Sequence, residues 1–479
     1  MDPDSRARSL ARLAGALLLG SAVGGLAVML VGGMRLDPMI GFAVPILVAG
    51  LFLLLTRFDW LLIAVMVTRA SLDPILSLIK GGGEGVGPGA AINAAVLLLG
   101  ALYLLRKPRA FARPHVLLWG LFLALAFSAC RYAPDVGKAS RMLVVYMTYA
   151  VMFAMPLAIV DNRTDARFWV RVLLIASIVP TLAGLFDMAT GGVKSAESEL
   201  LDPSVALTGL PERAGFRIQG AFTHPNIFAF YLVTLIATLL YAWRIGVFSG
   251  RTRWLAGLYM VVQIILLVST QTRSAWVAAA VVLFGYGVFV DRRLLLWGAI
   301  GCVSLLLVPV VQDRVLEVFG HGAPRMDDVL NSYQWRLAMW KSALPWIADR
   351  WLLGWGLDSY IGYSPIFFPL EYVVGFDAHS VYVQLAFEMG VPGAIAFALI
   401  FVGLIVMAFG WRRRHPLEAV LLICLSVAFL IVCYSDNMHR YLISNWYTFF
   451  FMGLLAAVAT GSGRLEGGTG ARRPKAATR

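Results

Sequence analysis

The feature that constrains this chain most is a succession of apolar runs, separated from one another by polar residues. A bilayer has a hydrocarbon core ~30 Å thick, so one spanning helix needs about 20 apolar residues. Inside lipid, every backbone polar group must be bonded within the spanning structure, so long continuous apolar runs predict helices. The pattern predicts about fourteen spans, near residues 11–33, 38–55, 59–79, 88–105, 114–130, 141–160, 169–189, 226–243, 254–268, 274–290, 294–310, 380–410, 417–434 and 446–461.

The composition agrees with a membrane protein. Of 479 residues, 60% are hydrophobic and 14% are charged, whereas soluble domains carry about 25% charged residues. This excludes soluble enzymes, nucleic-acid-binding proteins and secreted disulfide-rich domains. The apolar run at 13–30 follows arginines but lacks the short core and clear cleavage site of a signal peptide, so we expect a first span there. We therefore predict an all-α polytopic membrane protein with about 12–14 transmembrane helices.

The basic residues, which give a formal net charge of +13, gather in alternate connections between the apolar runs. Cytoplasmic loops of membrane proteins are enriched in Lys and Arg. The alternation predicts that both termini are cytoplasmic, and it accounts for the net charge without a nucleic-acid partner. The predicted cytoplasmic side carries Arg106, Lys107, Arg109, Arg113, Arg163, Arg167, Arg171, Arg244, Arg251, Arg253, Arg292, Arg293, Arg412, Arg413, Arg414, Arg472, Arg473 and Lys475.

Two connections, 190–225 and 311–379, are much longer than the others, and the alternation places both on the outer side. Long connections in compact domains are usually functional or disordered. The second is rich in Trp, Tyr and Phe, so it has enough apolar surface to fold, and we expect it to be partly helical. The connections divide the chain into N-terminal spans (1–189), central spans (226–310), C-terminal spans (380–461) and a cytoplasmic tail (462–479).

The first long connection ends in a polar stretch that runs directly into an apolar helix. Arg217 and His224 lie in this stretch, Pro225 suits a first helical turn, and Thr223 is predicted to cap it. A helix N-terminus offers unpaired N–H groups and a positive dipole, which beside an arginine attract phosphates. Arg217 and His224 are therefore candidate phosphate-binding residues. The alternative is an ordinary cap with an arginine beside lipid headgroups.

Two further outer stretches carry candidate residues. Hydroxyl groups and an amide surround Arg273 in a short hairpin at 269–274, which is more than an arginine reaching toward lipid needs; its planar guanidinium suits phosphate oxygens. His379 precedes an apolar helix that carries Glu388, and histidine is the most common general acid or base at neutral pH. The alternative is a structural histidine. Metal and nucleotide-binding motifs are lacking, so we expect chemistry without a metal or cofactor.

Three stretches occur in a characteristic order: FRIQGAFTHPN at 216–226, TQTRSAW at 270–276, and GWGLDSY at 354–360 followed by DAHSVYVQLAFEMGVPG at 377–393. Together they resemble the bacterial O-antigen ligase and polymerase superfamily, which includes WaaL O-antigen ligases and Wzy-type and ExoQ-type polysaccharide polymerases. The resemblance covers roughly 210–410. It implies a GT-C-like fold and an inverting, metal-independent glycosyltransferase that moves a glycan from undecaprenyl diphosphate to an acceptor hydroxyl.

The same resemblance implies roles for individual residues. Arg217 and Arg273 match the family's arginines that bind the carrier diphosphate, and His379 matches its functional histidine, which engages or deprotonates the attacking hydroxyl. Arg336 matches another recurrent position. From composition, the tryptophans of the second long connection would offer flat faces to sugar rings.

The partners implied are an undecaprenyl-diphosphate-linked glycan donor, the lipid bilayer and a chain-length regulator, at the periplasmic face of the bacterial inner membrane. A glycan acceptor would make the protein a polymerase, a lipid A core sugar a ligase, and a protein hydroxyl an O-oligosaccharyltransferase. The long connection favours a polymerase. The other classes considered are an anion transporter and a non-catalytic scaffold. Transport is disfavoured because the polar residues gather at one face rather than at the middle of the membrane. Arg69 and Asp73 lie one turn apart inside a span, and a pair within one helix explains them.

Overall fold

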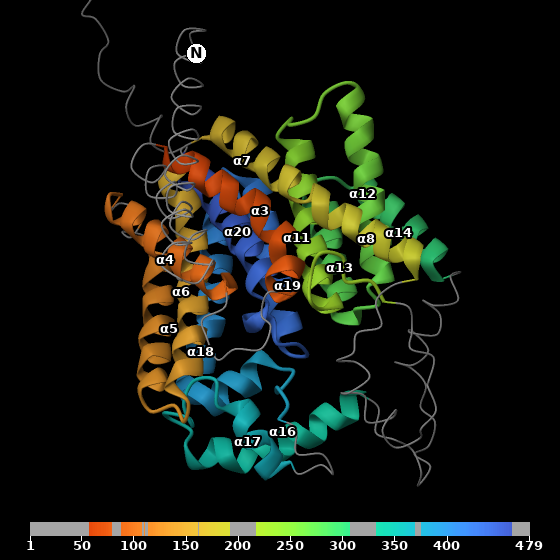
Figure 1. Ribbon diagram of the computed structural model, residues 1–479. Helices are drawn as coiled ribbons and strands as arrows, with labels where there is room; N and C mark the ends of the chain where they lie inside the picture. The colour runs from red at the N-terminus through yellow and green to blue at the C-terminus, as the bar shows by residue number, and fades with distance from the viewer. Residues whose placement is uncertain are drawn as a thin grey trace, which may run out of the picture. The chain divides into compact units, whose positions relative to one another are not determined.

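The computed structural model describes residues 57–78, 88–107, 110, 114–160, 162–191, 217–306, 332–368 and 375–461 (Figure 1). Every regular element in these ranges is a helix, and they contain no strand. The expected spans at 11–33 and 38–55, most of the connection 190–225, the first part of 311–379 and the tail 462–479 lie outside the described residues.

The apolar runs in the described residues form helices close to their expected positions. The helices are α3 (Phe58–Leu78), α4 (Pro88–Leu105), α5 (Pro114–Arg131), α6 (Val136–Ile159), α7 (Arg163–Ala176), α8 (Ile178–Thr190), α11 (Pro225–Arg244), α12 (Arg251–Ser269), α13 (Arg273–Phe289), α14 (Arg293–Leu306), α16 (Ser332–Asp349), α17 (Tyr360–Phe367), α18 (Val381–Trp411), α19 (Pro416–Cys433), η2 (Met438–Arg440) and α20 (Leu442–Gly461).

Within the described residues, seven helical stretches are long and apolar enough to cross a membrane, with α7 and α8 counted as one. Shorter apolar helices lie in α4, α5 and α13. These findings confirm an all-α, multi-pass membrane protein. The total of 12–14 spans stays a prediction.

The helices of 136–306 and 381–461 run back and forth, so their connections gather at two opposite ends. At one end, Arg163 lies 3.3 Å from a carboxylate oxygen of Glu418, and Arg167 Nε donates to the backbone oxygen of Ile245 at 2.6 Å. We call this the basic end, because its connections carry Arg244, Arg251, Arg253, Arg292, Arg293, Arg412, Arg413 and Arg414. We call the opposite end the site end; its connections include 217–224, 270–272, 375–380 and 434–441.

The expected span at 169–189 starts earlier and is broken. α7 begins directly after Asn162, whose side chain caps the first turn by accepting backbone N–H bonds. Ser177 separates α7 from α8, and its hydroxyl donates to the backbone oxygen of Leu174 at 2.6 Å and lies 2.8 Å from the hydroxyl of Tyr259. Such side-chain bonds compete with the helical ladder and bend helices, and the apolar pattern alone did not reveal the break.

The described part of the second long connection, 332–368 and 375–380, is here called the outer segment. It folds around an aromatic core, in which the rings of Trp346 and Trp355 lie 4.8 Å apart. Trp335, Trp346 and Trp355 are partly buried and pack against this core, and a role of the tryptophans as flat faces for sugar rings stays a prediction. The buried core residues are Met339, Trp340, Ala343, Ile347, Tyr360, Ala378 and, from α18, Phe387.

The outer segment docks on a kink in α18. The kink lies at Gly390, where φ is +73° and ψ is 172°. It interrupts the helical ladder and exposes backbone groups, to which the outer segment bonds: Trp355 N–H donates to Phe387 O at 2.8 Å, and Val391 N–H donates to Trp351 O at 2.7 Å. Figure 1 shows α16 and α17 beside this end of α18. The kink thus attaches the outer segment to the membrane helices at the site end.

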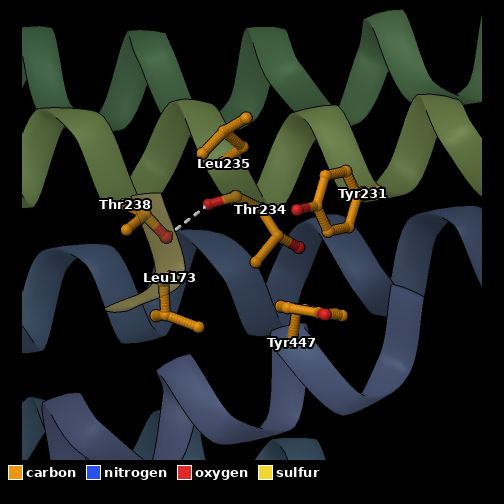
Figure 2. Close-up of a pocket in the computed structure, with 6 residues that line it drawn as sticks. All are labelled: Leu173, Tyr231, Thr234, Leu235, Thr238 and Tyr447. Carbon is orange, nitrogen blue, oxygen red and sulfur yellow. Dashed lines mark hydrogen bonds between the residues drawn. The ribbon is translucent and has the colours of Figure 1, made fainter. Parts of the chain in front are cut away.

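A small cavity lies in the bundle, lined by residues of α7, α11 and α20 (Figure 2). Its volume of about 10 Å³ is enough for about one water molecule. Thr238 Oγ1 donates to the backbone oxygen of Thr234 at 2.8 Å beside it. The cavity is too small for a sugar. Its lining residues are Leu173, Tyr231, Thr234, Leu235, Thr238 and Tyr447.

Candidate functional site

Arg217 lies at the site end and is anchored by hydrogen bonds from its guanidinium. Nε donates to the backbone oxygen of Thr270 at 3.0 Å, and Nη2 donates to Asn226 Oδ1 at 3.0 Å and to Thr272 Oγ1 at 3.2 Å. The partners come from the start of α11 and from the hairpin between α12 and α13. Bonds in several directions fix the plane of the guanidinium and therefore the position of its positive charge.

The turn that carries Arg217 is held by Asp187 of α8. The Oδ2 atom of Asp187 accepts the backbone N–H of Gln219 at 3.1 Å and that of Gly220 at 2.7 Å. Gly220 has φ +58°, and a Cβ there would lie 3.0 Å from the Phe228 ring, so the turn requires glycine. No sequence pattern singles out Asp187, because it lies near the end of an apolar helix far from Arg217 in the chain.

His224, rather than the expected Thr223, caps α11. Its Nδ1 accepts the backbone N–H of Asn226 at 3.1 Å, so the neutral ring carries its proton on Nε2. Burial, together with the charge of Arg217 and the nearby His379, lowers the pKa of His224 to about 4. His224 is thus a neutral imidazole at physiological pH, with an N–H donor at the site end.

Arg273 lies on the hairpin that binds Arg217. It is the first residue of α13, directly after Thr272, and it is exposed. Gln271 adopts φ +53°, which makes the hairpin tight enough to connect α12 to α13. The positive charge of Arg273 adds to the positive dipole of the α13 N-terminus. The hairpin therefore holds one arginine at its surface and another against its backbone.

His379 lies in the turn that leads from the outer segment into α18. Its φ of +48° is in the left-handed region, which costs a non-glycine residue about 1–3 kcal/mol. Its ring packs edge-on against Trp335, with centroids 6.1 Å apart. Burial, and then the charge of Arg336, lower the pKa of His379 to about 3. Arg336 is fixed in turn by a 2.7 Å bond from Nη1 to the backbone oxygen of Ser435.

The connection 434–441 joins these groups. Asn226, which binds Arg217, donates from Nδ2 to Asp436 Oδ2 at 2.9 Å, and the Tyr441 hydroxyl donates to Asp436 Oδ1. Burial raises the pKa of Asp436, although the bond from Tyr441 and the charges of Arg336 and Arg217 oppose the rise. Both arginines thus act on one buried carboxyl group. Through its bond with Asn226, this carboxyl group fixes the side chain that orients Arg217.

Residues 258–398 match a family model described as O-antigen ligase. This part of the chain is therefore similar to the O-antigen ligase family. No curated protein matches the chain. The O-antigen ligase match includes Arg273, Arg336 and His379, while Arg217 and His224 precede it. The match agrees with the resemblance carried by the sequence motifs, and it lies in a chain whose described part contains seven helical stretches long and apolar enough to cross a membrane.

Four of the five predicted site residues, namely Arg217, His224, Arg336 and His379, gather around the connection 434–441. Arg273 adjoins them through the hairpin. Sequence reasoning missed Asp187, Asn226, Asp436 and Tyr441. A sequence signal for Asp436 and Tyr441 is the polar run SDNMHRY at 435–441, which forms only a short outer connection. Over the described ranges, no group of three or more His, Cys, Asp or Glu is placed to hold a metal ion.

Proposed function

We propose that this protein transfers a glycan from undecaprenyl diphosphate to an acceptor hydroxyl at the periplasmic face of the bacterial inner membrane. The observation that carries the proposal is the convergence of Arg217, Arg336 and His379, from distant segments, around one connection at the site end. The basic connections lie at the opposite end, which the distribution of arginines assigns to the cytoplasm. The site end is then periplasmic.

The arginines supply the binding site for the diphosphate. Arg217 is oriented by its bonds to Thr270, Thr272 and Asn226, and Arg273 lies exposed on the same hairpin. Guanidinium groups bind phosphate oxygens through paired N–H donors. The polyprenyl tail would remain in the bilayer beside the helices that carry these residues, which accounts for a catalytic site built on membrane spans.

The reaction is a single displacement at the anomeric carbon. The acceptor oxygen forms a bond to that carbon, the bond from the carbon to the diphosphate oxygen breaks with its electron pair, and the acceptor proton passes to His379. Negative charge develops on the diphosphate as it leaves, and fixed cationic donors stabilise it. The configuration at the anomeric carbon inverts. Diphosphate is a good leaving group, so the reaction needs neither a protonating acid nor a metal.

Donor binding would tune His379. In the free protein, the ring is kept neutral by burial and by the charge of Arg336. A bound diphosphate brings negative charge to this region, which offsets that of Arg336 and favours the protonated imidazole. The pKa of His379 then rises when the donor is bound, so the histidine becomes a better base only when there is a glycan to transfer.

The chemical nature of the acceptor decides whether the protein is a polymerase, a ligase or a protein transferase. We prefer a polymerase, with a second lipid-linked glycan as acceptor, because the outer segment is long and docks on α18. A lipid A core acceptor would make a ligase, and a protein hydroxyl an O-oligosaccharyltransferase.

The test is turnover of purified undecaprenyl-diphosphate-linked glycan by the purified protein in the presence of EDTA. We expect wild type to act, and His379→Ala, Arg217→Ala and Arg273→Ala to lose at least about 100-fold in rate. Arg413→Ala, at the basic end, is the matched control and should retain wild-type turnover. A ladder of products indicates a polymerase, and a single shift of a supplied lipid or peptide indicates a ligase or a protein transferase.

One result would overturn the proposal, and another would remove His379 from it. Wild type that transfers no glycan to any of the three acceptor types, yet carries anions across liposome membranes, would make the protein a transporter. Turnover that survives His379→Ala would keep the transferase but remove the histidine from its chemistry.

A further inference from the structure

A second cluster of charged side chains adjoins the turn that carries His379. Arg440, in the connection 434–441, contacts three carboxylates: its Nη2 binds Asp358 Oδ1, its Nε lies 3.1 Å from Asp377 Oδ1, and Nη2 lies 3.8 Å from Glu388 Oε1. Asp358 belongs to the outer segment, Glu388 to α18, and Asp377 precedes His379 by two residues. One guanidinium thus joins the outer segment, the histidine turn and a membrane helix.

The residues just before His379 are held from several sides. Gln384 Nε2 donates to Asp377 Oδ1 at 3.0 Å, and its Oε1 accepts the backbone N–H of Ala378 at 3.2 Å. Trp340 Nε1 donates to the backbone oxygen of Ala378 at 2.6 Å. The turn is therefore attached to α16 through Trp340, to α18 through Gln384, and to the connection 434–441 through Arg440.

The backbone of His379 needs such support. A non-glycine residue with φ +48° persists only where its surroundings determine the conformation. The Arg440–Asp377 pair ties this turn to the connection carrying Asp436 and Tyr441, which in turn orient Arg217 through Asn226. The position of the histidine is thus linked to the position of the diphosphate-binding arginine.

Charge balance makes Arg440 hard to replace. Glu388 is almost fully buried, and its Oε1 also accepts a 3.0 Å bond from Gln384. Three carboxylates share this guanidinium, and buried carboxylates without a compensating cation repel one another and regain protons. Lysine would keep the charge but has a compact ammonium that does not reach the three carboxylates with a rigid, forked geometry.

We propose that Arg440 is a positioning residue for His379, acting through Asp377 to hold the histidine turn in register with the Arg217 site. Arg440 itself does not touch the substrate. This inference rests on the proposed glycan transfer, in which His379 receives the acceptor proton.

The first measurement is steady-state turnover of the lipid-linked glycan by the full-length protein. In Arg440→Lys, kcat should fall about 100-fold, because a shift of about 1 Å in a reacting group costs this much, while KM for the donor should stay within about twofold. Asp377→Asn removes the same ion pair and should lower kcat at least about 10-fold. The matched control is Arg163→Lys, which alters the 3.3 Å ion pair between exposed Arg163 and buried Glu418 at the basic end and should leave kcat unchanged.

The second measurement does not depend on activity. Modification of His379 by diethyl pyrocarbonate, followed by mass spectrometry, reports whether the turn is held. We expect about tenfold faster modification in Arg440→Lys and Asp377→Asn than in wild type or Arg163→Lys, because release of the turn exposes the ring. The unfolding midpoint of each variant shows whether it folds. If Arg440→Lys does not fold, the modification rate of Asp377→Asn tests the proposal by itself.

The two measurements distinguish a failure of the proposed glycan transfer from a failure of the positioning role of Arg440. Wild type without turnover would refute the proposed transfer, whereas the modification rates would still show whether Arg440 holds the turn. Wild-type modification rates in both variants, or a loss of kcat no larger than in Arg163→Lys, would overturn the positioning role. A rise in donor KM without a fall in kcat would also overturn it, because that would place Arg440 in donor binding.

Discussion

Replacing Gly390 with alanine should loosen the outer segment from α18. A Cβ on Gly390 would lie 2.4 Å from the backbone oxygen of Leu352 and 2.8 Å from that of Trp351. Neither atom is the end of a flexible side chain, so the backbone must move. The residue also has φ +73° and ψ 172°, a region that is almost exclusive to glycine.

The cost has two parts. Holding alanine in this backbone conformation costs about 1–3 kcal/mol. Moving the Trp351 carbonyl away breaks its 2.7 Å bond with the N–H of Val391, and an unpaired donor in the protein interior costs about 1–3 kcal/mol. The total is about 2–6 kcal/mol. Since 1 kcal/mol moves the midpoint of a large domain by about 2–4 °C, a drop of at least about 4 °C is expected.

The assay is thermal unfolding of the purified protein in detergent, followed by tryptophan fluorescence, because Trp346 and Trp355 report directly on the outer segment. Gly410→Ala is the matched control: it lies in the same helix, and nothing stands within 4 Å of its added Cβ. Its midpoint should stay within about 2 °C of wild type, as expected for a surface helical position. A midpoint of Gly390→Ala equal to that of Gly410→Ala would refute the reasoning, because the kink would then tolerate a side chain.

Two further outcomes are expected. Asp187→Ala removes the acceptor of two backbone N–H groups in the turn that carries Arg217, so donor KM should rise about 10-fold with less change in kcat; an unchanged KM would show that the turn holds itself. The pKa of His379, lowered to about 3 in the free protein, should keep kcat/KM insensitive to this group down to about pH 4. Its rise on donor binding should make kcat fall at a higher pH than kcat/KM does; the reverse order would contradict the tuning of His379 by the donor.

The sequence by itself determined where most of the apolar helices of the described residues lie. In lipid, an apolar run of about 20 residues has no stable alternative to a helix, so spans such as 88–105, 226–243 and 417–434 match the observed α4, α11 and α19 within a few residues. Polar residues interrupt these runs only where the chain leaves the apolar interior. The apolar pattern alone therefore places Arg217, Arg273 and His379 at helix ends, and the alternation of basic connections places them on one side.

Local irregularities were less visible in the sequence. The break at Ser177 depends on a hydroxyl bonding to the backbone and to Tyr259, and the cap of α11 depends on whether Thr223 or His224 faces the free N–H groups. Serine and histidine are compatible with helix and loop alike. Whether each residue lies in a helix or in a loop depends on the groups that contact it in the packed structure.

Only the tertiary structure decided which helix ends share a site. Arg217 bonds to Thr270, 53 residues away, and Asn226 to Asp436, 210 residues away. Membrane helices are apolar on most of their faces, so hydrophobic periodicity carries little information on which helix packs beside which. The partners are selected by close packing and by the few polar bonds at the ends. For that reason the connection 434–441, with Asp436 and Arg440, joins the site only through the packing of α19 and α20 beside α11 and α18.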